Sequence, residues 1–424
     1  MNKILITNNK YLIFFLYFIF LSAFIFNEDS LGGARKDFGY LFEHTLEFKE
    51  DFFYTFFNYD KTNARHSPLF LIINSILLKV IKYEFNLRFL LFHLNIITIY
   101  YFYKTLRIKF DNVDKKILIL LSGLLIFSPA FRSSSVWPDS YNAGLLFLII
   151  SFYNYYKYKN NLKIKYFFYC TVFYTIASYF SPNFSLFSGF FFLNFCFLNK
   201  KKKEIIFFFI INWLFAFPAI YYLFILKINF FHLGEQIYGY DENFISLKNL
   251  SNKIILLPPI IAFHLLPIIF FKKKYNNFLL SDLFYFILYY ILIKIFFEQN
   301  FNYADVYKLI GGGGILYNLY YYNFLNLNFI IIISAISILI IQKIIRYKID
   351  YFIILLIILS SPQLSIYHQY FEPLIYLLIF FEFLKVNEFK INYKNISMLF
   401  IYLILFLTLN ILKSDIKNLI LKYY

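Results

Sequence analysis

Charged residues are scarce in this chain: Asp, Glu, Lys and Arg make up 15% of its 424 residues, whereas hydrophobic residues make up 61%. So few charges cannot cover the surface of a water-soluble globule of this length. Cysteine is also rare, and Cys170 and Cys196 lie in apolar segments without a CxxC pattern or a nearby histidine cluster. Neither a disulfide framework nor a zinc site therefore has support. The composition predicts an all-α polytopic membrane protein.

Lys and Arg outnumber Asp and Glu by 41 to 24, which gives a net charge of +17. In a soluble protein this excess would suggest nucleic acid as a partner. Here the cations gather in short stretches between apolar runs, as they do in cytoplasmic loops of membrane proteins, so we expect no nucleic-acid partner. The basic stretches are Lys104/Arg107/Lys109/Lys115/Lys116, Lys157/Lys159/Lys163/Lys165, Lys200 to Lys203, Lys272 to Lys274, Lys343/Arg346/Lys348 and Lys385/Lys390/Lys394.

Apolar runs predict about thirteen transmembrane helices, with a cytoplasmic N-terminus and an extracytoplasmic C-terminus. The first run is longer than the apolar core of a typical signal peptide, so we expect it to be retained. No internal repeat interrupts the series, which predicts a single transmembrane domain over residues 1–424. Heavy use of Lys, Asn, Ile, Phe and Tyr is typical of AT-rich coding and favours a bacterial cytoplasmic or inner membrane. The runs lie near residues 10–26, 88–103, 115–131, 139–156, 166–181, 184–198, 205–227, 254–271, 277–297, 328–342, 350–361, 371–384 and 396–412.

Three longer polar stretches, 27–86, 228–253 and 298–327, fall on the extracytoplasmic face, where we expect any chemistry to occur. Within the first, residues 67–81 (SPLFLIINSILLKVI) are apolar enough to span. A span here would reverse the charge pattern of every later loop. We therefore predict an interfacial or re-entrant helix that begins at Pro68.

Carboxylates follow the first apolar run closely. Asp37 lies near the expected bilayer surface, where a carboxylate could act as a general base toward an acceptor hydroxyl. A solvated loop acid is the plainer interpretation of Asp37. Glu28 and Asp29 are alternative candidates for the base.

Arg132 and Asp139 flank Ser-Ser-Ser-Val-Trp-Pro, which we expect to form a short outer hairpin between two helices. Arg132 could donate a fork of hydrogen bonds to a lipid phosphate, and Trp137 suits the depth of the lipid headgroups. Alternatively the stretch is an interfacial anchor, with Asp139 capping the next helix.

Further polar residues cluster in the outer stretch 361–373. His368, Tyr370 and Glu372 could hold a headgroup or sugar hydroxyls. Glu372 could equally be a first-turn helix acid, followed by Pro373 at a position that suits a helix start.

Three other features have plainer explanations. Gly311 to Gly314, just after Lys308, lacks the GK[ST] of a Walker A loop and is better explained as a flexible turn. His93 and His264 lie deep in apolar runs and are expected to be packed, hydrogen-bonded core residues rather than parts of a proton relay.

The layout of residues 1–200 is a first helix, a long acidic outer loop, a Pro-led amphipathic segment (His66-Ser-Pro-Leu-Phe-Leu) and helices joined by short loops. This layout resembles the GT-C superfamily of polyprenyl-phosphate-sugar glycosyltransferases, which includes protein mannosyltransferases and lipid A aminoarabinose transferases. The YHQYFEP stretch is similar to outer-loop motifs of such proteins. The resemblance implies a GT-C-like bundle in which an acid of the first outer loop, by position Asp37, acts as catalytic base or binds the acceptor or a metal.

The resemblance also implies an enzyme that moves a sugar from a polyprenyl phosphate to a cell-envelope glycan, lipid or protein. Arg132, His368 and Lys308 are then candidates for stabilising the departing lipid phosphate. No cofactor is certain, although the loop carboxylates could hold Mg²⁺ or Mn²⁺. A flippase or transporter of lipid-linked sugars is the alternative, for which we would expect charged residues along a central path. An O-antigen-type polymerase would be expected to carry arginine-rich outer loops.

Overall fold

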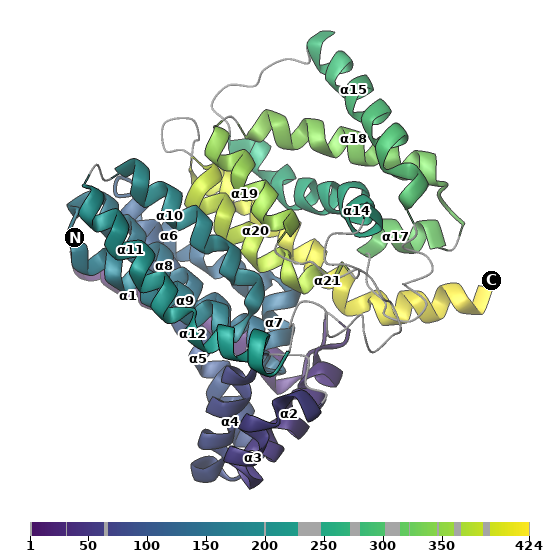
Figure 1. The fold of residues 1–424 in the computed structure, drawn as a ribbon. Helices are drawn as coiled ribbons and strands as arrows, with labels where there is room; N and C mark the ends of the chain where they lie inside the picture. Colours follow the sequence, from purple (N-terminus) through teal and green to yellow (C-terminus); the bar gives the residue numbers. More distant parts are fainter. Residues whose placement is uncertain are drawn as a thin grey trace. The chain divides into compact units, whose positions relative to one another are not determined.

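A computed structural model describes the chain as an assembly of helices, and no strand occurs within the described ranges, which confirms the predicted all-α class. Helix contacts divide the chain into unit 1, Met1–Ile228 with Ile391–Tyr424, and unit 2, Asn229–Lys390. Figure 1 labels the helices of both units. The described residues are 2–30, 32–62, 67–198, 201–227, 247–271, 280–301, 314–321, 323–345, 347–359, 366–384 and 391–423.

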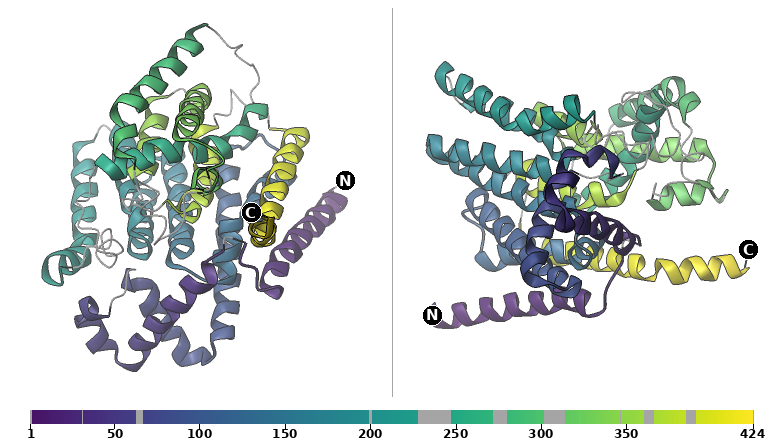
Figure 2. Two further views of the ribbon diagram at one scale, coloured as in Figure 1. Left: turned by 90° about the vertical axis from the view of Figure 1, so that its right-hand side faces the viewer. Right: turned by 60° about the horizontal axis from the view of Figure 1, so that its bottom comes forward.

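Unit 1 contains a row of long helices. α8 packs along α5 and α9, and α9 contacts α10 and α11, so that α8 to α11 run side by side (Figures 1 and 2). The helices of unit 1 are α1 (Asn2–Ile25), α2 (Ala34–Glu50), α3 (Phe52–Phe57), η1 (Tyr59–Lys61), α4 (Pro68–Ile81), α5 (Glu84–Lys109), α6 (Lys115–Gly123), η2 (Leu124–Phe127), α7 (Pro129–Val136), α8 (Ser140–Asn161), α9 (Ile164–Phe180), η3 (Pro182–Leu186), α10 (Phe187–Leu198), α11 (Lys202–Phe215), α12 (Phe217–Ile220), the π-helix η4 (Tyr221–Ile225) and α21 (Tyr393–Tyr423).

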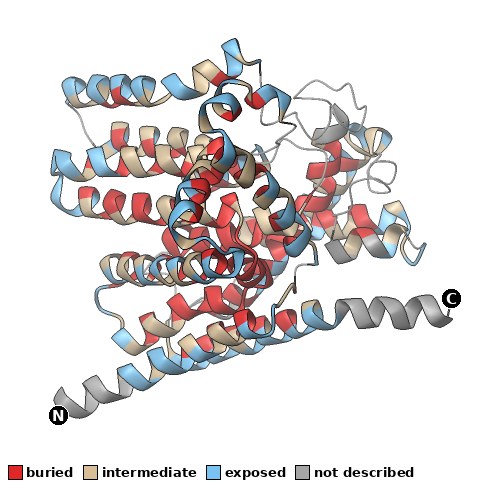
Figure 3. Ribbon diagram, turned by 90° about the horizontal axis from the view of Figure 1, so that it is seen from below, coloured by how far each residue is buried: buried red, intermediate tan, exposed pale blue. Residues whose placement is uncertain are grey.

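The core of unit 1 lies where these helices face one another, and the buried residues concentrate there (Figure 3). Gly144 lets α8 approach its neighbours closely. A Cβ atom at this position would lie 2.8 Å from the ring of Phe184 and 3.0 Å from the carbonyl oxygen of Ala177. Such distances are too short for carbon contacts, so any larger residue would push α8 away from α9 and η3.

The stretch between α1 and α5 is largely helical. α2, α3 and α4 lie together beyond the ends of the long helices of unit 1, below them in Figure 1. α4 begins at Pro68, as predicted, with Ser67 as its N-cap. Proline suits this position because the first N–H groups of a helix have no intrahelical partner. α3 exposes three aromatic side chains: Phe53, Tyr54 and Phe57.

Four helical segments among the described residues are long and apolar enough to cross a membrane: Glu84–Lys109, Leu250–Ile268, Leu327–Ile344 and Tyr393–Leu412. Two bent pairs raise the number to six if each is one span: Lys115–Phe127 with Pro129–Val136, bent by 69°, and Lys202–Phe215 with Phe217–Ile225, bent by 43°. The expected total of about thirteen spans is therefore not confirmed. Several expected spans form shorter apolar helices instead, because an apolar run does not reveal where its helix breaks.

Unit 2 is also helical. α14 packs along α18, and Lys343 at the end of α18 contacts Asp282 at the start of α15, with 2.6 Å between Nζ and Oδ2. The expected loop 228–253 is partly helical, since α14 begins at Leu247. The elements are α14 (Leu247–Leu265), η5 (Leu266–Phe271), α15 (Leu280–Phe296), η6 (Glu298–Asn300), α17 (Gly314–Tyr321), α18 (Leu327–Ile344), α19 (Lys348–Leu359), η7 (His368–Tyr370), α20 (Glu372–Leu378) and the π-helix η8 (Ile379–Phe383).

Candidate active site

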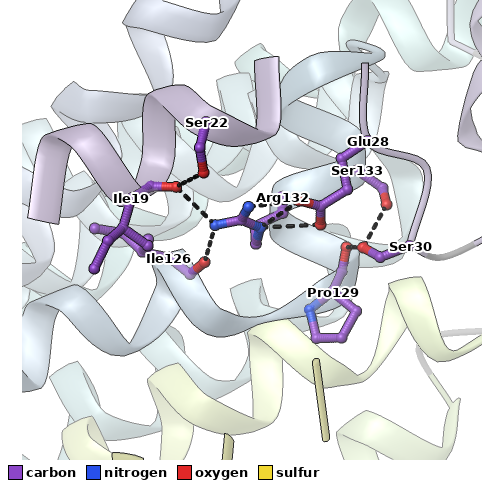
Figure 4. A network of polar contacts seen from close by, with 8 residues as sticks. All are labelled: Ile19, Ser22, Glu28, Ser30, Ile126, Pro129, Arg132 and Ser133. Atoms are coloured by element: carbon purple, nitrogen blue, oxygen red, sulfur yellow. Dashed lines mark hydrogen bonds and ion pairs between the residues drawn. The ribbon is translucent and has the colours of Figure 1, made fainter. Parts of the chain in front are cut away.

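A buried ion pair joins the turn after α1 to helix α7 (Figure 4). The Nε atom of Arg132 donates to both carboxylate oxygens of Glu28, at 2.9 and 3.0 Å, and Nη2 donates to Oε2 at 2.5 Å. Nη1 donates to the carbonyl oxygens of Ile19 and Ile126, at 3.0 and 3.3 Å. Arg132 is thus bound on three sides by groups of the chain itself. A ligand phosphate at Arg132 would have to compete with Glu28.

The segment that carries Arg132 differs from the expected surface hairpin. All eight residues of α7 are buried, so that prediction was wrong. Ser128 starts the helix by accepting a hydrogen bond from Phe131 N, and Ser135 donates to Phe131 O. These hydroxyls satisfy backbone groups that could not otherwise be buried. Ser30 adds another link, with its Oγ 3.1 Å from the Oγ of Ser133 (Figure 4).

Asp29 caps helix α2. Its carboxylate accepts backbone N–H bonds from Gly32, Gly33, Ala34 and Arg35, at 3.0 to 3.4 Å. Gly32 has a φ of 80°, a left-handed conformation that glycine adopts without steric cost. A carboxylate also interacts favourably with the positive end of the helix dipole. Asp29 therefore fixes the start of the helix that carries Asp37.

Two carboxylates, at the starts of α2 and α8, interact electrostatically with each other. Asp37 is exposed in the first turn of α2. Asp139 caps α8, as the alternative interpretation predicted, because its Oδ1 accepts from Asn142 N at 2.7 Å and its Oδ2 from Ser134 Oγ at 2.8 Å. Burial raises the pKa of Asp139 from 3.8 to about 6; the hydrogen bonds oppose this rise, and the negative charge of Asp37 adds to it.

Two guanidinium groups lie over the indole of Trp137. The guanidinium carbon of Arg88, from α5, lies 3.5 Å from the ring centroid, and that of Arg35, from α2, lies 5.1 Å away. Arg88 also donates to Val136 O and Asn27 Oδ1, at 3.0 Å each. Arg35 is exposed, whereas the Trp137 N–H is buried and has no hydrogen-bond partner in the described part of the chain. Two cations and an unused N–H donor favour an anion or another acceptor-rich ligand at this place.

Unit 1 thus brings together five of the residues that the sequence singled out: Glu28, Asp29, Asp37, Arg132 and Asp139. Sequence reasoning did not assign a site role to Arg35 or Arg88. Arg88 could have been found, since an arginine near the start of an apolar run is costly without a partner.

The other described candidates lie in unit 2. Glu372 is buried in the first turn of α20, beside Pro373, which agrees with its interpretation as a first-turn acid. The His368 ring centroid lies 6.3 Å from that of His264, whose Nδ1 is 2.9 Å from the Tyr376 hydroxyl. His264 is therefore a packed, hydrogen-bonded residue, as predicted.

The remaining candidates from the sequence are Tyr370 and Lys308. Tyr370 contacts Tyr367, with ring centroids 6.2 Å apart. Lys308 lies outside the described residues. Within the ranges that the structure describes, no three His, Cys, Asp or Glu side chains are grouped so that they could hold a metal ion.

Two comparisons of the sequence with known proteins found no relative. No protein-family model matches the chain, and no curated protein matches it in sequence.

Proposed function

We propose that this chain is a membrane glycosyltransferase of the GT-C type, with about thirteen transmembrane helices. It moves a sugar from a polyprenyl phosphate to a cell-envelope glycan, lipid or protein on the extracytoplasmic face of a bacterial cytoplasmic or inner membrane. The proposal is supported above all by one observation: the exposed carboxylate of Asp37 interacts electrostatically with Asp139 at the end of unit 1 that also holds Arg35, Arg88 and Trp137. This set supplies both a base and positive charge.

Asp37 is the base in this proposal. It takes the proton of the acceptor hydroxyl while the hydroxyl oxygen bonds to the anomeric carbon of the sugar. The bond between that carbon and the phosphate oxygen breaks, and its electron pair leaves with the polyprenyl phosphate.

The departing phosphate is stabilised by Arg35, and the charge of Arg88, on the same indole ring, adds to the positive potential there. Arg35 is better suited to this role than Arg132, because Arg35 is exposed, whereas Arg132 already donates to Glu28 and to two carbonyl oxygens. Glu28 and Arg132 then act as positioning residues that hold the turn before α2.

Asp29 positions Asp37 by capping the same helix. Lys308, His368, Tyr370 and Glu372 remain candidates for binding the donor or acceptor.

The transferase proposal is tested with membranes that contain the protein and a panel of polyprenyl phosphates carrying radiolabelled sugars. We expect label to enter an envelope acceptor, and Asp37→Asn to abolish this because it removes the base at constant size. Asp60→Asn is the matched control, since Asp60 is an exposed acid of the same outer stretch. Label that crosses the bilayer without transfer would instead identify a flippase.

Two variants of α2 test whether Arg35 binds the phosphate of the donor. Arg35→Gln and Lys36→Gln each remove one exposed positive charge from α2, but only Arg35 lies over Trp137. We expect Arg35→Gln to raise the KM for the lipid-linked donor about tenfold or more, as for a lost charge-assisted hydrogen bond. Equal KM values in the two variants would refute the assignment.

A further inference from the structure

A tyrosine side chain is inserted into a helix of unit 1 where that helix bends. α11 turns by 43° as it passes into α12 and η4. Pro218 has no N–H to bond with the carbonyl of Leu214. The next helical bond, from Ala219 N to Phe215 O, is also replaced, because the Tyr179 hydroxyl accepts from Ala219 N at 3.2 Å and donates to Phe215 O at 2.5 Å. A side chain inserted into the hydrogen-bond ladder is a known cause of helix kinks.

Tyr179 also connects the bend to the outer helices. It lies at the end of α9, and its backbone carbonyl accepts a hydrogen bond from the hydroxyl of Ser67, the N-cap of α4. Carbonyls in the last turn of a helix have no intrahelical partner, so this bond satisfies a group that would otherwise lack one. One residue thus joins the end of α9, the start of α4 and the break between α11 and α12.

The segment beyond the bend packs on α3 and η1 through aromatic rings. Tyr221 stacks on Phe56 with ring centroids 6.3 Å apart. Tyr222 meets Phe56 and Tyr59 edge to face, with centroids 6.0 and 5.9 Å apart. Tyr59 and Tyr222 are buried in this contact, so the direction of η4 determines whether the aromatic cluster can form.

We propose that the Tyr179 hydroxyl is a wedge that keeps α11 and η4 bent, and that the bend docks η4 on the outer helices α3 and η1. Without the hydroxyl, Ala219 N and Phe215 O bond directly and the helix straightens. Turning Phe217–Ile225 through 43°, with a rise of about 1.5 Å for each residue, displaces the far end of this segment by about 10 Å. This role of Tyr179 does not depend on the proposed glycosyltransferase activity.

The competing explanation is that Pro218 alone causes the bend. The two explanations predict opposite outcomes. With a wedge, Tyr179→Phe straightens the helix and Pro218→Ala leaves it bent. With a proline kink, Pro218→Ala straightens it and Tyr179→Phe does not.

Spin labels on Phe53→Cys and Phe224→Cys report the distance between α3 and η4, since these side chains are 71% and 74% exposed. The two native cysteines are first replaced by alanine. We expect Tyr179→Phe to shift the distance by several ångström, up to about 9 Å, relative to the labelled parent, and Pro218→Ala to leave it unchanged. Tyr174→Phe is the matched control, because this buried tyrosine of the same helix forms no bond with the described residues of α11 or α12.

An unchanged distance in Tyr179→Phe would overturn the wedge. A shift of equal size in Tyr174→Phe would overturn it as well, because the effect would then come from a general loosening of α9.

Discussion

Replacing Arg132 by Met is the most direct test of how the candidate site is held together. The change keeps much of the apolar stem but removes the guanidinium that binds Glu28 and the carbonyl oxygens of Ile19 and Ile126. Removing one partner of a buried ion pair costs about 3–5 kcal/mol, because the other charge stays buried without compensation. Solvent screens the attraction between these two charges only a little, because the side chains of Arg132 and Glu28 are 5% and 10% exposed. We therefore expect the free energy of unfolding to fall by about 3–5 kcal/mol.

Denaturant-induced unfolding of the purified protein in detergent measures this loss. The double variant Glu28→Gln/Arg132→Met removes both charges and should be more stable than the sum of the two single changes implies, by about 1–3 kcal/mol. Arg35 is an exposed arginine of the same unit and serves as the control: Arg35→Gln should change the free energy of unfolding by less than about 0.5 kcal/mol. A cost below about 1 kcal/mol for Arg132→Met, or full additivity in the double variant, would refute the view that this pair holds α7 to the turn after α1.

Three further changes test the elements around this pair. Asp29→Ala should lower the free energy of unfolding by about 1 kcal/mol because α2 loses its cap, and Asp29→Asn should recover much of that loss. The raised pKa of Asp139 means that the folded chain binds this proton more tightly than the unfolded chain. Protonated Asp139 therefore adds about 3 kcal/mol to the free energy of unfolding below about pH 4, and this contribution is lost as the pH rises through 6. Unfolding midpoints measured from pH 4 to 7 should show this slope in the native sequence and a flatter profile in Asp139→Asn. Gly144→Ala should destabilise the protein by about 1–3 kcal/mol through its clash with Phe184. Gly39→Ala has open space around it and should be neutral or stabilising in the same unfolding assay.

The sequence predicted those features that depend on a few neighbouring residues. Pro68 at the start of α4, Asp139 as the cap of α8 and Glu372 in the first turn of α20 are all confirmed. Each depends on a helix start, where the unpaired N–H groups favour a small set of residue types within one turn. The all-α class could also be predicted, because few charges and many apolar runs indicate a polytopic helical membrane protein.

The contacts that assemble the candidate site could not be predicted from the sequence. Glu28 and Arg132 are 104 positions apart, and Arg88 and Trp137 come from different helices. Such pairs depend on how helices pack, and the sequence shows charges and apolar runs without showing which will meet. Arg132 illustrates the difference, because the pattern predicted a surface residue that was open to phosphate, whereas packing buries it against Glu28.

The surroundings of Trp137 also give the protein a built-in optical probe. The chain has only two tryptophans, and Trp213 near the end of α11 is 57% exposed, whereas Trp137 is 5% exposed. A Trp213→Phe variant would therefore emit from a single indole that contacts two guanidinium groups. Any ligand that draws Arg35 away from the ring, or accepts a hydrogen bond from the indole, would change the wavelength and intensity of that emission. Fluorescence titration could then rank unlabelled compounds at this site before a transferable sugar is identified.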